Sequence, residues 1–294
     1  MFMEGCAVKD LILSLEATCD LDKETIKKYD LSVVDMEFKV GDDFFKTSEH
    51  DVVSSGLYEK MVKKQKTSTS QINAYDYEQH FLKLLEQDKP ILHLAFSSSL
   101  SGTGLVAKQV ADELNESHDT KIYVIDTLCG SYGQGLLAIL IRENIDKFEN
   151  IEDVIKFVES NKFKMRHLFT VDTLTYLANG GRLDSKTAFF GNLLNIKPVM
   201  HLSRNGKLEV VHKVISRKKS ICNLVDMIKK TYDENSKICF IAHANCEKDA
   251  IFLESKLKTD FDINTKIVNL GPVIGAHSGP GTLAIFYLGK DERD

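Results

Sequence analysis

The chain of 294 residues lacks the features that mark several specialised classes of protein. It contains only four prolines, and its six cysteines form no CxxC pair. Its longest apolar run, residues 135–141, is too short to span a bilayer and is typical of a buried helix. The net charge of −5 and the pI near 6.0 do not favour a surface for nucleic acid or anionic membranes. We therefore expect a globular protein with no membrane span.

The cysteines and the first residues indicate the compartment. Cys239 and Cys246 flank His243, but a structural zinc site needs about four ligands and no closing ligand is evident. The first ten residues contain an early acidic residue and no basic segment, so no signal peptide is predicted. We expect reduced thiols, no bound metal, no cofactor and a cytoplasmic protein.

Strands alternate with helices in the first half of the chain. Residues 90–96 read as a buried strand, and the segment that begins at Thr103 has apolar residues at helical spacing. Residues 121–127 read as the next strand, followed by a helix from Gly130 that is apolar nearly all round. This alternation predicts an α/β domain whose parallel sheet is covered on both faces.

The second half predicts a mixed α+β unit. The dipeptide Asn205-Gly206 is a strong hairpin signal between two strands. Helical and strand patterns then alternate to the end of the chain, at residues 221–232, 238–242, 247–257, 266–270 and 283–289. We predict a parallel-sheet domain over residues 1–162 and an α+β domain over residues 163–294. A loop around residues 60–80 can pack on the second domain.

A cluster of hydroxyls follows the predicted strand at residues 90–96. Five hydroxyl side chains lie within the seven residues 97–103, with Gly102 and Gly104 among the last of them. The end of a parallel strand and the start of a helix favour an anion, because free backbone N–H groups and the helix dipole point there. The alternative is an ordinary N-cap, which needs one such hydroxyl. No Walker-type or G-x-G-x-x-G motif is present, so a nucleotide is not indicated.

A second glycine-rich stretch surrounds His277. Residues 271–281 contain closely spaced glycines and two prolines, which predicts a loop with a fixed backbone course. His277 could donate to a carboxylate there, and a carboxylate would favour its charged form. The alternative is a turn histidine exposed to water. G-x-S-x-G requires serine at the centre, where His277 stands and Ser278 follows, so a nucleophile elbow is resembled only loosely.

Three spaced motifs make the chain resemble the DegV family of bacterial fatty-acid-binding proteins. "TSQI" at residues 69–72 resembles the family's T-S-Q-P, "SSSLSGT" at 97–103 its S-S-x-x-S-G-T, and "GPVIGAHSGPG" at 271–281 its G-P-V-I-G-x-H-x-G-P-G. Supporting matches are "YLANGGRL", "LLNIKPVM" and "VISRKKS". The sequence departs from the family pattern at Glu16 and Ala17, where D-S is usual, at Ile72 and at Asn179.

The resemblance implies a two-domain fold with a long-chain fatty acid buried between the domains. Carried over by motif, the residues expected to bind the carboxylate are Thr69, Ser70, Ser101, Gly102, His277 and Ser278. Arg182 and Arg217 are candidates for the pocket mouth or for a partner surface. The apolar residues considered for the tunnel, which could equally be ordinary core, are Phe189, Phe190, Leu193 and Leu194.

The expected function is that of a lipid carrier without catalysis of its own. The resemblance implies that it presents the fatty acid to a separate ATP-dependent kinase subunit, which forms the acyl phosphate in phospholipid metabolism. Two alternatives stay open on the residues alone. One is an acyl hydrolase or transferase that uses a serine of residues 97–101 with His277, and the other is a small-anion binding protein.

Overall fold

The chain passes three times between two structural units. In the computed structural model, Met1–Met36 and Gln71–Phe163 form unit 1, whereas Glu37–Ser70 and Lys164–Asp294 form unit 2. The structure describes residues 8–183, 196–234, 236, 238–261 and 263–294. The expected division at residue 162 places residues 37–70 in the first domain, and only a loop around residues 60–80 is expected to pack on the second. In the structure this segment belongs to unit 2, because its strands and helix pack on the C-terminal segment α11 (Pro272–Ser278).

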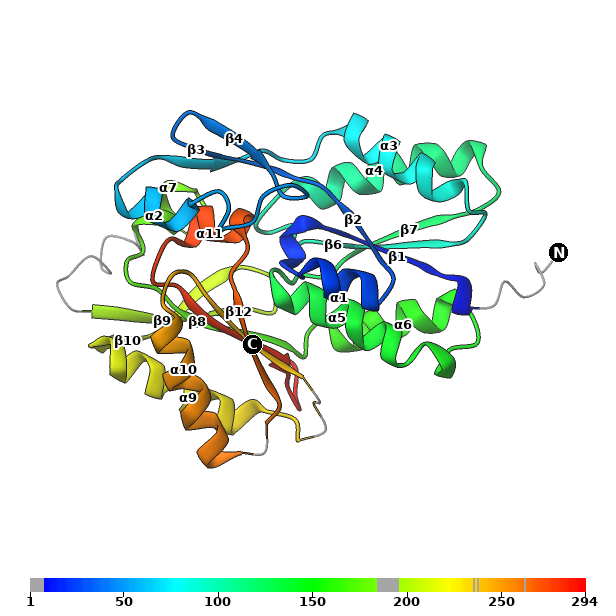
Figure 1. Ribbon diagram of the computed structural model, residues 1–294. Helices are drawn as coiled ribbons and strands as arrows, with labels where there is room; N and C mark the ends of the chain where they lie inside the picture. Colours follow the sequence, from blue (N-terminus) through cyan, green and yellow to red (C-terminus); the bar gives the residue numbers. More distant parts are fainter. Residues whose placement is uncertain (1–7, 184–195, 235, 237, 262) are drawn as a thin grey trace. The chain divides into compact units, whose positions relative to one another are not determined.

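Unit 1 contains a four-stranded sheet in which every strand pair is parallel. The order is β2 (Leu31–Val34), β1 (Ile12–Glu16), β6 (Ile91–Ala95) and β7 (Ile122–Asp126). The helices α3 (Ala74–Leu85) and α4 (Thr103–Ser117) lie on one face, and α5 (Tyr132–Glu143) and α6 (Ile151–Asn161) lie on the other (Figure 1). Shorter elements are η1 (Val8–Asp10), η2 (Ala17–Cys19), α1 (Lys23–Lys28) and η3 (Ile145–Lys147). The predicted parallel sheet with two covered faces is confirmed.

The core of unit 1 explains why its strands read as continuous apolar runs. Every residue of β1 and β6 is buried, because helices cover both faces of the sheet. Helix α5 is buried on nearly all sides, as its apolar composition predicts.

Unit 2 contains a six-stranded mixed sheet. The order is β10 (Leu208–Ile215), β9 (Ile196–Leu202), β8 (Met165–Thr170), β13 (Leu283–Leu288), β11 (Cys239–His243) and β12 (Thr265–Asn269). Only the β11–β12 pair is parallel among these strand pairs. Helices α9 (Arg217–Thr231) and α10 (Glu247–Asp260) pack side by side on this sheet (Figure 1). The predicted hairpin forms at Asn205-Gly206, where Gly206 has φ +70°.

A smaller antiparallel sheet completes unit 2 with residues 37–70. The order of its strands is β4 (Asp43–Lys46), β3 (Glu37–Val40) and β5 (Thr67–Thr69). Helix α2 (Leu57–Val62) lies between β4 and β5 in the chain. Phe38 and Val40 of β3 are buried. Helix α11 contacts β3, β5, α2 and the short helix α7 (Thr175–Asn179). No described helix combines the length and the apolar composition that crossing a membrane requires.

Helix α11 packs so closely on α2 that a side chain at Gly275 has no room. A Cβ atom there would overlap the buried ring and hydroxyl of Tyr58. The Tyr58 hydroxyl also donates to the Leu270 carbonyl at 2.7 Å, so the ring cannot easily move. The absence of a side chain at Gly275 therefore determines how near α11 lies to α2.

We predict that Gly275→Ala lowers the free energy of unfolding by about 1–3 kcal/mol, because it inserts a methyl group into a filled space. Tyr58→Ala removes the obstructing ring, so the double variant should lose less than the sum of the two single losses. Urea unfolding of the four proteins measures this coupling. Strictly additive losses would show that the two residues do not compete for the same space.

Candidate functional site

The segment around His277 is a short helix rather than the loop that the glycines predict. Pro272 occupies the first turn of α11, where its missing N–H costs no hydrogen bond. Gly279 ends the helix with φ +83°, a conformation that favours glycine. The expectation that His277 lies on a loop is therefore wrong, because it lies in the last turn of α11.

His277 and Thr69 contact each other within unit 2, although 208 residues separate them. Thr69 Oγ1 lies 2.8 Å from His277 Nε2, and Thr67 Oγ1 donates to the Ala276 carbonyl at 2.9 Å. Both threonines belong to β5, which pairs with β3. A side chain at Gly180 would overlap His277 Nδ1, so the "NGG" sequence leaves room for the ring.

The imidazole of His277 is neutral at neutral pH. Burial, together with the smaller effect of the positive charge of Arg182, lowers its pKa from 6.5 to about 4. A neutral ring has one N–H donor and one acceptor nitrogen, so His277 and the Thr69 hydroxyl can exchange donor and acceptor roles. The pair can therefore present an O–H or N–H donor to a ligand without a fixed positive charge on the ring.

Ser278 adds a second polar group next to His277 in the sequence. Its side chain is 5% exposed, and its hydroxyl has no hydrogen-bond partner among the described residues. A buried hydroxyl without a partner is costly, which is typical of a group that a ligand completes. Ser70, by contrast, is exposed and its backbone N–H donates to the Glu37 carbonyl.

The hydroxyl-rich loop lies in unit 1, at the end of β6 and before α4, as predicted. The backbone N–H groups of Leu100 and Ser101 donate to the Ser97 carbonyl at 3.0 and 3.1 Å. Ser101 Oγ accepts from the Thr103 N–H at 3.3 Å, which leaves its O–H free to donate. Gly102 precedes α4, and a Cβ there would come within 3.2 Å of the Gln71 amide oxygen. The loop is thus both a helix start and a cluster of donors.

The predicted site residues fall into two groups. Thr69, Ser70, His277 and Ser278 belong to unit 2, whereas Ser101 and Gly102 belong to unit 1. Arg182 follows the two glycines beside His277, and its guanidinium donates to the Gly180 carbonyl. The tunnel candidates Phe189, Phe190, Leu193 and Leu194 lie outside the described residues.

Arg217 takes part in ion pairs at the start of α9. Its Nε lies 2.9 Å from Asp249 Oδ2, and its Nη1 lies 4.0 Å from Asp172 Oδ1. Its side chain is 18% exposed. These contacts give Arg217 a role in joining α9 to α10, whatever its proximity to a ligand. Within the part of the chain that the structure describes, no three His, Cys, Asp or Glu side chains gather as a metal site would require.

A buried carboxylate in unit 1 supports the hydroxyl loop, and the sequence did not reveal it. Glu16 ends β1 and has no exposed surface. Its carboxylate accepts from the Tyr77 hydroxyl at 3.0 Å, the Phe96 N–H at 3.0 Å and the Gln134 amide at 2.6 Å. His93 Nε2 lies 3.3 Å from the same carboxylate. Both carboxylate oxygens of Glu16 thus have polar partners.

The partners of Glu16 lie at both ends of the hydroxyl loop. Phe96 directly precedes Ser97, and the Tyr77 hydroxyl also lies 3.0 Å from Thr103 Oγ1 at the start of α4. Burial raises the pKa of Glu16, but the effects of His93, Gln134 and Tyr77 together outweigh it and hold the pKa below its ordinary value. Glu16 is therefore ionised and fixes the course of residues 97–102.

We predict that Glu16→Gln lowers the free energy of unfolding by about 3 kcal/mol, because an amide N–H₂ would face groups that donate to the carboxylate. The depressed pKa gives the carboxylate a stabilising effect that is present above its unfolded pKa and is lost as pH falls through the folded pKa. Urea unfolding at neutral and acidic pH should show the variant converging on the wild type in acid. An equal difference at all pH values would contradict this assignment.

For His277, NMR titration of the ring should give a midpoint near 4 in the folded wild type. Arg182→Gln should raise the midpoint, but not to 6.5, because burial is the larger cause. Because the unfolded ring binds its proton first, the folded state should lose stability as pH falls from 6.5 to 4. A wild-type midpoint near 6.5 would show that the ring is solvated.

The fold defines the class as a two-unit α/β protein. One unit has a parallel sheet and the hydroxyl loop, and the other has a mixed sheet and the Thr69–His277 pair. The family model of the DegV family matches residues 13–290. A DegV domain-containing protein of Clostridium perfringens is 32% identical over 290 residues, which cover 97% of this chain and 100% of that protein. The chain belongs to the DegV family.

Solved structures share this fold. A DegV lipid binding protein of Thermotoga maritima has a TM-score of 0.81 and 28% identity, covering 97% of this chain and 99% of that one. A second Thermotoga maritima protein, reported to reveal a fatty acid binding function, has a TM-score of 0.79 and 27% identity over 95% of this chain and 99% of that one. The predicted fold and family are confirmed by these likenesses.

Proposed function

We propose that this protein binds a long-chain fatty acid and that the carboxylate accepts hydrogen bonds from the predicted site residues. The donors would be the hydroxyls of Thr69, Ser101 and Ser278, the Gly102 N–H and His277, with Ser70 beside them. The observation that carries the proposal is the Thr69–His277 pair at 2.8 Å, next to a buried Ser278 hydroxyl without a described partner. The lipid and fatty acid binding of the Thermotoga maritima relatives supports it.

The energetics favour a long acyl chain over a small anion. Burial of each CH₂ group contributes roughly 0.8 kcal/mol, so about a dozen methylenes supply on the order of 10 kcal/mol before ordering costs. Each hydrogen bond to the charged head group contributes about 1.5–3 kcal/mol. The acyl chain would therefore dominate affinity, and the head-group donors would set orientation and avoid an unpaired buried charge.

The site supports binding better than acyl hydrolysis. A hydrolase needs a serine activated by a histidine that a carboxylate orients. The hydroxyl next to His277 Nε2 is that of Thr69, and Nδ1 faces Gly180. No carboxylate bonds to this ring among the described residues. We therefore propose a carrier without catalysis of its own. We further propose that it is cytoplasmic and that it presents the fatty acid to a separate ATP-dependent kinase subunit for acyl-phosphate formation.

Protein purified from bacteria should carry a fatty acid, which organic extraction and mass spectrometry would identify. After delipidation, Thr69→Val, Ser101→Ala and His277→Gln should each weaken binding of palmitate about ten-fold to a hundred-fold. The double variant Thr69→Val with His277→Gln should be non-additive, because the two side chains contact each other. Fluorescence competition or calorimetry measures these affinities.

The exposed residues Ser68 and Ser98 provide matched controls, since Ser68→Ala and Ser98→Ala should leave binding unchanged. The methyl ester of palmitate should show little difference between wild type and variants, because it carries no charge. An extract without fatty acid, together with no binding of added palmitate, would overturn the proposal. Equal affinity for a short anion such as acetate would favour the small-anion alternative.

A further inference from the structure

A cavity of about 400 Å³ lies within unit 2, apart from the Thr69–His277 pair. It opens at the carboxyl ends of the parallel strands β11 and β12, where His243 and Asn269 pair in register. Helix α10 begins just after β11, and its first residue, Glu247, also lines the cavity. In open α/β sheets, this edge of parallel strands is where ligands commonly bind.

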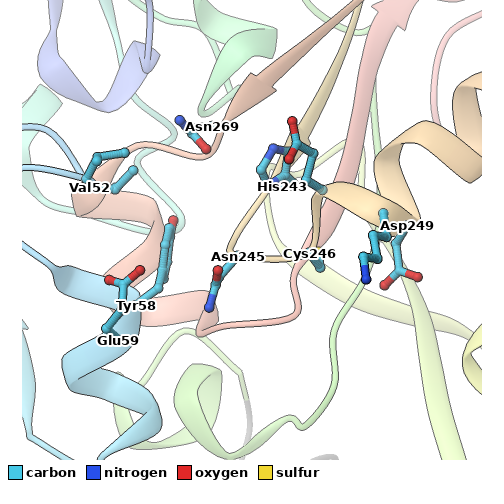
Figure 2. A pocket seen from close by; sticks show the side chains of 11 residues that line it. Val52, Tyr58, Glu59, His243, Asn245, Cys246, Asp249 and Asn269 are labelled. Atoms are coloured by element: carbon cyan, nitrogen blue, oxygen red, sulfur yellow. The ribbon is translucent and has the colours of Figure 1, made fainter.

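One wall of the cavity is apolar and aromatic. Val52 and Tyr58 form it, and both side chains are buried. The Tyr58 hydroxyl donates to the Leu270 carbonyl, so the ring rather than the hydroxyl faces a ligand. Figure 2 shows Val52 and Tyr58 on the side opposite His243 and Asp249. This wall can contact a short hydrocarbon stem.

The polar lining carries more negative than positive charge. Its carboxylates are Glu59 of α2 and Glu247 and Asp249 of α10, and its cation is Lys248. Asp249 is already paired with Arg217 at 2.9 Å. Glu59 and Glu247 form no ion pair with any described residue. Two exposed carboxylates at one cavity repel an anion and attract a cation.

His243 supplies an acceptor inside the cavity. Its side chain is 8% exposed, and Nδ1 is buried without a hydrogen-bond partner among the described residues. Burial lowers its pKa, although Glu247 raises it, so the ring is neutral at neutral pH. A neutral imidazole has one acceptor nitrogen, which an N–H donor of a ligand can satisfy. With the ring proton on Nε2, Nδ1 is that acceptor, and its lack of a partner among the described residues indicates a missing donor.

We propose that this cavity is a second binding site, specific for a primary ammonium group on a short hydrocarbon stem. The three ammonium N–H groups match the carboxylates of Glu59 and Glu247 and the ring of His243, and the stem lies against Val52 and Tyr58. Ammonium on a hydrocarbon stem occurs both in free alkylamines and in lysine side chains. A metal ion fits less well, because the described residues contain no metal-binding cluster.

The test is a titration of the full chain, labelled with ¹⁵N-histidine, with n-pentylammonium chloride. The His243 ring signals, assigned by their loss in His243→Gln, should shift and saturate. Pentanoate and pentanol, which share the stem but lack the ammonium, should not produce a saturable shift. Nα-acetyl-lysine N-methylamide tests the second source, and tighter binding of this probe would assign the site to a lysine residue of a partner protein.

Two surface variants keep the test independent of folding. Glu59→Gln and Glu247→Gln each remove a carboxylate from an exposed side chain and should weaken n-pentylammonium binding at least ten-fold. Lys248→Gln lies at the same cavity and removes a repelling charge, so it should bind as tightly as wild type or more tightly. The proposal would be overturned by no saturable shift with n-pentylammonium or by equal binding of pentanoate. Unchanged n-pentylammonium binding in both Glu59→Gln and Glu247→Gln would also overturn it.

Discussion

The close packing of α11 at glycine positions determines where Thr69 and His277 of unit 2 lie. Gly275 allows α11 to approach Tyr58, and Gly180 allows the His277 ring to occupy its place. Gly279 turns the chain out of the helix against Tyr176. With α11 fixed in this way, β5 presents Thr69 to His277 and Thr67 to the Ala276 carbonyl. The spacing of glycines is thus a packing requirement on which the Thr69–His277 contact depends.

Two polar groups away from bulk water differ in charge. His277 is half-buried and near the cation Arg182, and it is neutral, so it offers a donor and an acceptor without a charge of its own. Glu16 is buried deeper but is kept ionised by three hydrogen bonds and by His93. The first arrangement leaves bonding capacity for a ligand. The second uses all of it to fix the loop that carries Ser101 and Gly102.

The features that depend on local pattern could be predicted from the sequence. The strand at residues 90–96 and the helix from Thr103 are visible as a buried run followed by a 3.6-residue period, and the structure has β6 and α4 there. The hairpin at Asn205-Gly206 is a two-residue signal. Ser101 and His277 were found because they stand in motifs, and motifs are continuous in sequence.

The features that depend on distant contacts could not be predicted. The sequence suggests a contact with the second domain only for a loop around residues 60–80. The whole segment 37–70 joins unit 2 because β3 and β5 pack with α11, which follows more than two hundred residues later. Helix α11 itself was hidden, because proline and glycine at both ends gave it the composition of a loop. Glu16 read only as a departure from a motif, since its partners Tyr77 and Gln134 lie 61 and 118 residues away.

The central claim is that Thr69 and His277 bind the carboxylate of a fatty acid. It is tested most directly by the ¹³C NMR signal of [1-¹³C]palmitate bound to the delipidated protein. The chemical shift of the carboxyl carbon depends on its hydrogen-bond donors. Its value in the bound state should therefore change from that in the wild type both in Thr69→Val and in His277→Gln. The same bound signal in all three proteins would contradict the claim and place the carboxylate elsewhere.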